Sequence, residues 1–86
     1  MKTEIMDKFY QAIKDGSMVF VDIVVEGFGS FCNELVLSDV EDREHTIIIE
    51  GNGFNYTVSS DHIEYDDMTN EYTLGEGSKY VTIQFA

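Results

Sequence analysis

The chain of 86 residues has one thiol, Cys32, and two imidazoles, His45 and His62, which are the side chains that Cys–His nucleophile chemistry requires. A cysteine nucleophile needs a histidine in contact with it and a third group that orients the histidine. Nothing in the spacing of these residues brings them together. We therefore interpret Cys32 as a small, half-buried apolar side chain and His62, which follows Asp61, as a solvated strand residue. The chain is predicted not to be an enzyme.

Two glycine-rich segments imitate phosphate-binding motifs. Gly27-x-Gly29 follows a predicted strand but leads into another strand, whereas a dinucleotide-binding motif opens a helix. The segment Gly75-Glu76-Gly77-Ser78-Lys79 ends like a P-loop but lacks the four-residue spacing and the helix. Both segments are predicted to be turns, because glycine tolerates positive φ. No cofactor is expected.

Two acidic segments offer the oxygen atoms that calcium prefers. The first holds Asp66, Asp67, Asn70 and Glu71, and the second holds Asp39, Glu41, Asp42 and Glu44. Neither has the EF-hand order of alternating acids, a central glycine and a terminal glutamate. Both are interpreted as solvated connections, and no metal site is predicted. A calcium-responsive module stays open as a third class of function, and a chelator would lower its melting temperature.

Acidic side chains on the outward faces of predicted strands are the main candidate site. They are Asp22, Glu26, Glu34, Glu50 and Glu64, joined by Asp66, Asp67 and Glu71 of a polar turn. Same-face neighbours lie about 6.6–6.8 Å apart along a strand and about 4.8 Å apart across strands. That spacing is of the order of the backbone charges on nucleic acid, one per ~3.4 Å of axis per strand. A rigid sheet of this kind can occupy a groove that binds DNA or RNA.

Solubility is the competing interpretation of the same acids. Charged side chains keep a small sheet soluble and block pairing at its edges. Like charges that face each other across strands lower stability, however, and lysines would solubilise the sheet without that repulsion. Both interpretations stay open at the level of the sequence.

A strand over residues 17–26, SMVFVDIVVE, must position the first of these acids. Val19, Val21, Ile23 and Val25 form an unbroken β-branched row at a period of two. The alternate positions begin apolar and turn acidic. This pattern is typical of a strand with one face in the core and the other partly in water.

A helix is predicted over residues 3–14, before this strand. Its apolar residues recur at spacings of three and four on one side, namely Ile5, Met6, Phe9, Tyr10, Ala12 and Ile13. Thr3 is the candidate N-cap, Lys14 suits the last turn, and Gly16 suits the left-handed position just beyond the end. The wide apolar stripe favours packing on a sheet.

Alternating apolar residues predict further strands at 31–38, 45–50, 54–59, 63–65, 72–74 and 80–85. Asn52-Gly53 is a hairpin signal, because this dipeptide accepts positive φ, while Asp39–Glu44 is interpreted as a charged connection. The predicted fold class is α+β, a single domain over residues 1–86. An N-terminal helix packs on a curled antiparallel sheet or small open barrel of six to seven short strands spanning about 17–85. An Sm-like barrel is the alternative topology.

The charge is strongly asymmetric along the chain. Seventeen acids and five bases give a net charge of −12, and residues 1–14 alone have a net charge of +1. This balance argues against direct binding to nucleic acid or to an anionic membrane, because both need basic patches. The first residues lack the apolar core of a signal peptide, and the lone cysteine excludes an intrachain disulfide. A cytoplasmic protein with a basic partner is expected, and the oligomeric state stays open.

Four features of the chain belong together: its small size, its lack of proline, its near-basic helix ahead of strands, and its acid-rich segments DVEDRE and HIEYDDMTNEY. In these features the chain resembles small phage-encoded DNA mimics, including anti-CRISPR inhibitors. The resemblance covers the whole chain as composition and involves no motif. It implies a cytoplasmic protein of the host cell that blocks a nucleic-acid-handling effector. In a CRISPR effector of the Cas9 type, the carboxylates would pair with arginines and lysines that read DNA, and Phe28, Tyr65 and Tyr72, where exposed, would anchor the interface.

Two hypotheses follow. The first is a non-enzymatic inhibitor that presents an acidic surface to a basic nucleic-acid-binding protein. The second is a small structural or assembly module of a phage or bacterial complex, bound through a sheet edge or the helix, whose acids are incidental. Binding by the first weakens steeply with ionic strength, whereas binding by the second barely responds to it.

Overall fold

The computed structural model describes all residues, Met1–Ala86. One helix precedes eight strands: α1 (Lys2–Asp15), β1 (Met18–Val25), β2 (Gly29–Val36), β3 (Asp39–Asp42), β4 (Thr46–Gly51), β5 (Phe54–Ser59), β6 (Ile63–Asp66), β7 (Glu71–Glu76) and β8 (Lys79–Phe85). Every pair of neighbouring strands is antiparallel. The predicted α+β class, a helix with a mostly antiparallel sheet, is confirmed.

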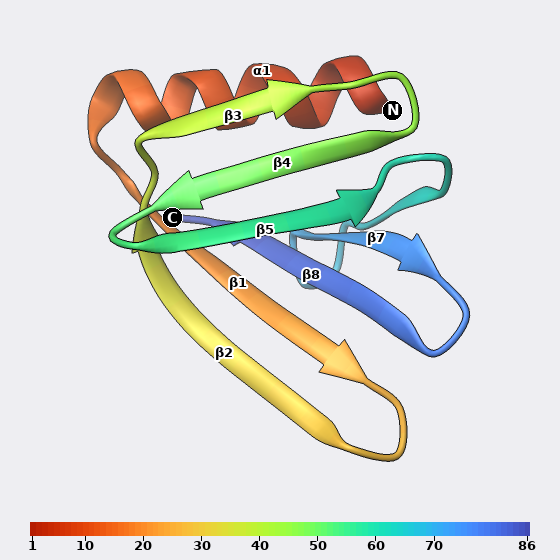
Figure 1. The fold of residues 1–86 in the computed structure, drawn as a ribbon. Helices are drawn as coiled ribbons and strands as arrows, with labels where there is room; N and C mark the ends of the chain where they lie inside the picture. The colour runs from red at the N-terminus through yellow and green to blue at the C-terminus, as the bar shows by residue number, and fades with distance from the viewer.

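The strands form two sheets that share one core (Figure 1). The five-stranded sheet has the order β2-β1-β8-β7-β6, so the last strand pairs with the first, and the three-stranded sheet has the order β3-β4-β5. Strand β5 passes beside β7, and α1 lies alongside β3. The result is a curled, open arrangement in which the helix and the three-stranded sheet cover one face of the five-stranded sheet.

Strand β3 is the element that the sequence analysis missed, and it raises the number of strands from the predicted six or seven to eight. Its only buried side chain is Val40, which lies opposite Ile49 of β4. The other three positions are acidic and exposed, and Asp42 forms an ion pair with Lys2 of α1 at 2.7 Å. A short edge strand of this composition has the pattern of a charged connection, which explains the error.

The helix extends one residue beyond each predicted end. Gly16 takes the predicted left-handed conformation, with φ of 66°, and the amides of Gly16 and Ser17 donate to the carbonyls of Ile13 and Ala12. The predicted N-cap is wrong: Met1 occupies the N-cap position, and no side chain caps the helix. Lys2, by its ion pair with Asp42, instead fixes the start of α1 against β3.

The core lies between the two sheets and α1. Sixteen buried apolar side chains form one cluster, and nine side chains from α1, β1, β4, β7 and β8 are almost completely buried: Ile5, Phe9, Val19, Val21, Ile47, Ile49, Leu74, Val81 and Ile83. The predicted inward row of β1 is therefore confirmed at Val19 and Val21. The helix is neither long nor apolar enough to cross a membrane.

Two glycines and an asparagine shape the three-stranded sheet. Asn52 and Gly53 have φ of 47° and 79°, which forms the predicted tight hairpin between β4 and β5. At Gly51 a Cβ atom would lie 2.6 Å from the Val36 carbonyl oxygen. Only glycine therefore lets the end of β4 approach the place where the chain crosses from one sheet to the other.

Candidate functional site

Five of the predicted acids lie on the face of the five-stranded sheet that points away from the core. We call Asp22, Glu34, Glu64, Asp66 and Glu71 the acidic sheet face. Asp22, Glu34 and Glu71 alternate with the buried residues Val21, Leu35 and Tyr72. Glu64 and Asp66 of β6 lie on the same face because their register partners are Thr73 and Glu71 of β7. The strand periodicity therefore positions them, and they come from β1, β2, β6 and β7.

Strand register places the five carboxylates in two adjacent rows. One row runs Glu34, Phe20, Gln84, Glu71, Asp66 across the sheet, and the next runs Cys32, Asp22, Thr82, Thr73, Glu64. Each row spans five strands, about 19 Å at ~4.8 Å per strand. Asp66 and Glu71 are directly opposite each other, a pairing of like charges that lowers stability.

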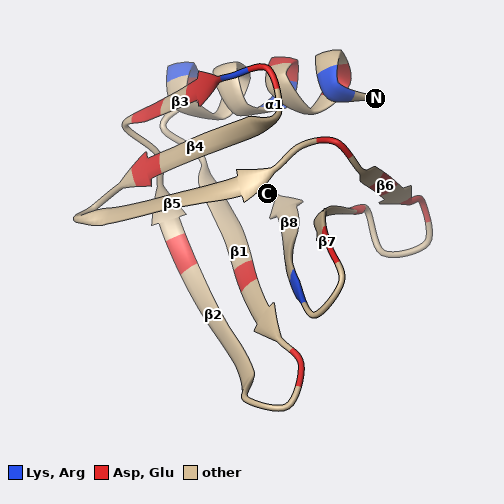
Figure 2. Cartoon of the chain, turned by 45° about the vertical axis from the view of Figure 1, so that its right-hand side comes forward, with Lys and Arg blue, Asp and Glu red and all other residues tan.

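No lysine or arginine occupies the strand positions of this face. In Figure 2 the lysines and arginines lie on α1, just after β3 and at the start of β8. Lys2 and Arg43 pair with Asp42 and Glu41, at 2.7 and 3.1 Å, around the other sheet. Lys79, at the start of β8, lines a hollow with Tyr56–Ser59 and so lies on the opposite side of the five-stranded sheet. The carboxylates of the acidic sheet face are not neutralised by the chain itself.

Asp22 is the most constrained of these acids because it lies in a strand paired on both sides. Its side chain is half-buried between the registers of Cys32 and Thr82, and its Oδ1 atom is buried without a hydrogen bond. The carboxylate lines a shallow hollow of about 230 Å³, with Glu71 and four neutral side chains, namely Phe20, Cys32, Thr82 and Gln84. A buried carboxylate oxygen without a partner is unfavourable unless a donor reaches it.

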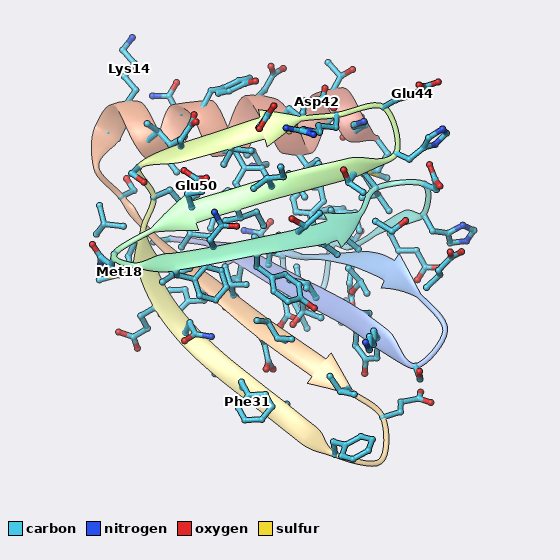
Figure 3. All side chains as sticks on the ribbon, viewed as in Figure 1. Lys14, Met18, Phe31, Asp42, Glu44 and Glu50 are labelled. Carbon is cyan, nitrogen blue, oxygen red and sulfur yellow. The ribbon has the colours of Figure 1, made fainter.

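The other three predicted acids lie apart from this face. Glu26 and Asp67 are exposed in the β1–β2 and β6–β7 turns, at the border of the five-stranded sheet. Glu50 belongs to β4 of the three-stranded sheet (Figure 3), where its carboxylate accepts a hydrogen bond of 3.0 Å from Asn55. Glu50 therefore lies on a separate surface with Asp39, its register partner.

The three predicted aromatic anchors have different environments. Phe28 is 86% exposed in the β1–β2 turn, as an anchor must be. Tyr65 is 40% exposed, but its hydroxyl donates to Asn70 at 2.6 Å and its ring packs on Tyr72 at 4.7 Å between centroids. Tyr72 is buried, so it does not meet the requirement that an anchor be exposed. Phe31, 61% exposed on β2, is an aromatic surface residue that the sequence analysis did not single out.

Burial of Tyr72 gives the fold a pH dependence. Desolvation, followed by the nearby Tyr65 and Glu4, raises the pKa of the Tyr72 hydroxyl above its ordinary value of 10.0. The unfolded chain ionises this group first, so its contribution to stability is complete below pH 10.0 and is lost as the pH rises through the raised pKa. We expect the free energy of unfolding of Tyr72→Phe, measured by urea unfolding, to fall less steeply with rising pH above 10.0 than that of the wild type. Tyr10→Phe, at an exposed position on α1, is the control and should leave the slope unchanged.

The three candidate catalytic residues are not brought together. Cys32 lies on β2 of the five-stranded sheet and is exposed rather than half-buried, so its predicted environment is wrong. His45 precedes β4 of the other sheet, and His62 precedes β6. The sequence analysis missed the pair of His45 and Asp61, whose Nδ1 and Oδ1 atoms are 2.9 Å apart.

Ser60 lies next to this pair but does not complete a catalytic triad. Its amide donates to the His45 carbonyl at 2.9 Å, yet its buried hydroxyl has no hydrogen-bond partner. The free ring nitrogen of His45 faces Glu44 at 3.8 Å instead. A nucleophile needs direct contact with its base, and this arrangement does not provide it.

The two acidic segments hold no metal cage. No group of three or more histidine, cysteine or acidic side chains is arranged to hold an ion. In the β6–β7 turn, Asp66 Oδ1 accepts the Met68 amide at 2.9 Å. In the other segment, Glu41 and Asp42 pair with Arg43 and Lys2. These contacts are those of turn and surface residues.

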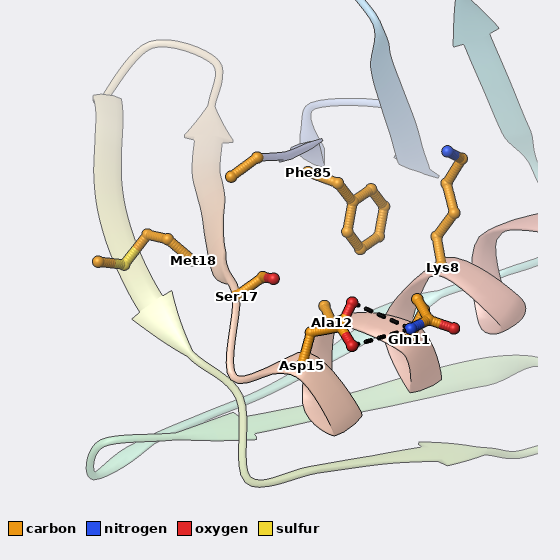
Figure 4. Close-up of a pocket in the computed structure, with 8 residues that line it drawn as sticks. Lys8, Gln11, Ala12, Asp15, Ser17, Met18 and Phe85 are labelled. Carbon is orange, nitrogen blue, oxygen red and sulfur yellow. Dashed lines mark hydrogen bonds between the residues drawn. The ribbon is translucent and has the colours of Figure 1, made fainter.

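A small hollow of about 150 Å³ lies where the end of α1 meets β1 and β8 (Figure 4). Gln11 donates to both carboxylate oxygens of Asp15, at 3.0 and 2.9 Å, and Lys8, Ser17 and Phe85 complete most of the lining. The Asp15 carboxylate is thus engaged by an amide of its own helix.

Comparisons of the chain with protein-family profiles, curated proteins and solved structures found no match.

Proposed function

We propose that this protein is a non-enzymatic inhibitor that binds a basic nucleic-acid-binding protein through the acidic sheet face. The observation that carries the proposal is the pair of rows that hold five carboxylates without a cation. The acids form two groups on adjacent strands, Asp22 with Glu34 and Glu64 with Asp66 and Glu71, and the spacing within each group suits lysines and arginines that bind neighbouring phosphates. The antiparallel sheet fixes that spacing, so little order has to be created on binding.

Asp22 favours binding over solubility as the role of these acids. A carboxylate that serves only solubility belongs where water surrounds it, whereas one Asp22 oxygen is buried without a partner. A guanidinium group from a partner, inserted into the hollow that Asp22 shares with Glu71, would donate to the accessible oxygens of these two carboxylates. An arginine is therefore the proposed occupant of this hollow in the complex.

The proposed partner belongs to the class of nucleic-acid-handling effectors, such as a CRISPR effector, whose charged channel holds DNA or RNA. With a net charge of −12, the protein itself repels nucleic acid and anionic membranes. The single, exposed thiol of Cys32 is compatible with the reducing cytoplasm, where we propose that the complex forms.

Affinity capture from a bacterial lysate tests this function. The immobilised protein is expected to retain a nucleic-acid-binding protein that elutes at moderate salt, because screening weakens contacts between exposed charges. Added DNA should release the same protein, identified by mass spectrometry. Retention that is indifferent to salt or to DNA would contradict the proposal.

Strand β2 supports the second candidate, an assembly module. It has eight residues and pairs only with β1, so its outer edge presents unpaired backbone groups to a strand of another chain. Binding by this edge depends on backbone hydrogen bonds. It would survive high salt in the capture experiment, which separates the two candidates.

A further inference from the structure

The end of the β1–β2 hairpin projects beyond the cover of the core (Figure 1). The exposed fraction of the side chains on the inner side of β2 rises toward the turn: Leu35 is 5% exposed, Asn33 is half-buried and Phe31 is 61% exposed. Phe31 lies opposite Ile23 (Figure 3). It is on the same side of the sheet as Leu35, which faces the core at the other end of β2. The core therefore ends before the hairpin does.

The two sides of this hairpin end differ in chemistry. The inner side and the tip carry Val25, Phe28 and Phe31, which we call the hairpin patch. The outer side carries Asp22 and Glu34, with Glu26 in the turn. The one cation at this end, Lys79, is the register partner of Val25 and so lies on the inner side. Within the hairpin itself, acid is confined to the outer side and the turn, and on the inner side Lys79 is the register partner of Glu76 of β7.

A tight turn holds the tip in place. The Phe28 amide donates to the Val25 carbonyl at 3.0 Å, and the Glu26 amide donates to Ser78 of the neighbouring turn at 2.8 Å. Gly27, with φ of 84°, supplies the left-handed conformation that the turn needs. Phe28 is therefore presented on an anchored turn.

We infer that the hairpin end imitates single-stranded nucleic acid, so that the partner is a protein whose groove takes a single strand with unstacked bases. In such a strand, the charges follow one side and the planar bases project from the other. Proteins that bind it combine a basic groove with apolar or aromatic platforms on which the bases stack. The rings of Phe28 and Phe31 would occupy those platforms while Asp22, Glu26 and Glu34 meet the basic groove.

This inference rests on the proposed function, and a competition experiment separates the two. The captured protein is challenged with a thymidine oligonucleotide and with a DNA duplex at equal phosphate concentration. We expect the single strand to release it at the lower concentration. Phe28→Ser and Phe31→Ser should each weaken its affinity roughly 5- to 150-fold, the range for one stacked base. Tyr10→Ser, which removes an exposed ring from α1, is the matched control and should bind like the wild type.

Three other outcomes would contradict the inference. Equal release by duplex and single strand, with unchanged affinity of both phenylalanine variants, overturns the inference and leaves the proposed function standing. Release by neither nucleic acid overturns both. Self-association of the wild type that Phe28→Ser abolishes, seen by sedimentation without any effect on capture, would assign the hairpin patch to a second copy of the chain and overturn the inference.

Discussion

Replacing Phe9 with alanine is expected to lower the free energy of unfolding by about 3–5 kcal/mol, the range for a buried phenylalanine. The side chain is completely buried and meets Phe85 of β8 edge to face, at 5.2 Å between centroids. Phe85 in turn meets Tyr72 at 6.0 Å. This series of rings joins α1 to β8 and β7, so the cavity would open between the helix and the five-stranded sheet.

The expected loss is large for a chain of 86 residues. Small domains have about 0.05–0.15 kcal/mol of stability per residue, or ~4–13 kcal/mol here. Urea unfolding measures the change, and near-ultraviolet circular dichroism reports whether the aromatic packing survives. Tyr10→Ala is the matched control, because this neighbouring ring is 51% exposed and its loss should change stability by no more than about 0.5 kcal/mol. Equal effects of the two substitutions would show that Phe9 does not join the helix to the sheet.

Local periodicity was sufficient to predict most of this fold. The β-branched row of β1, the apolar stripe of α1 and the Asn52-Gly53 turn each depend on neighbours in sequence. Strand β3 was missed because its composition lacks the alternation of a strand: Val40 is its only buried side chain. The segment is a strand because its backbone pairs with that of β4.

The candidate site was predictable only in part, for a different reason. Alternation along a strand gives the face of a residue but not the sheet to which the strand belongs, so Glu50 could not be separated from Glu34 and Glu64. Alternation also cannot show where the core stops. Tyr72 is buried and Phe31 exposed on the same side of one sheet, because the cover of helix and second sheet reaches only the first of them.

Neutralising the acidic sheet face with amides of the same shape should weaken capture of the basic partner strongly. The variant carries Glu34→Gln, Glu64→Gln, Asp66→Asn and Glu71→Gln. Exposed ion pairs contribute about 0.2–1 kcal/mol each, so four losses predict roughly 4- to 900-fold weaker binding. Asp22 is left in place because its environment is partly buried, and its loss would confuse folding with binding.

The same variant should be no less stable than the wild type. Asp66 and Glu71 repel each other across β6 and β7, and relief of such a pair raises stability by about 0.2–1 kcal/mol. Weaker binding by a more stable fold is the result that a purely solubilising role of these acids does not predict. Thermal unfolding and the salt concentration of elution measure the two quantities on the same preparations.

A control variant of equal charge separates the face from the total charge. Glu4→Gln, Asp7→Asn, Asp39→Asn and Glu44→Gln remove four exposed acids from α1 and from the region of the three-stranded sheet. Both variants then have a net charge of −8 instead of −12. Because close contacts and not the overall field hold the complex in the proposed mechanism, the control should elute near the wild type. Equal weakening of the two variants would mean that binding depends on the total charge of the protein. The acidic sheet face would then not be the binding site.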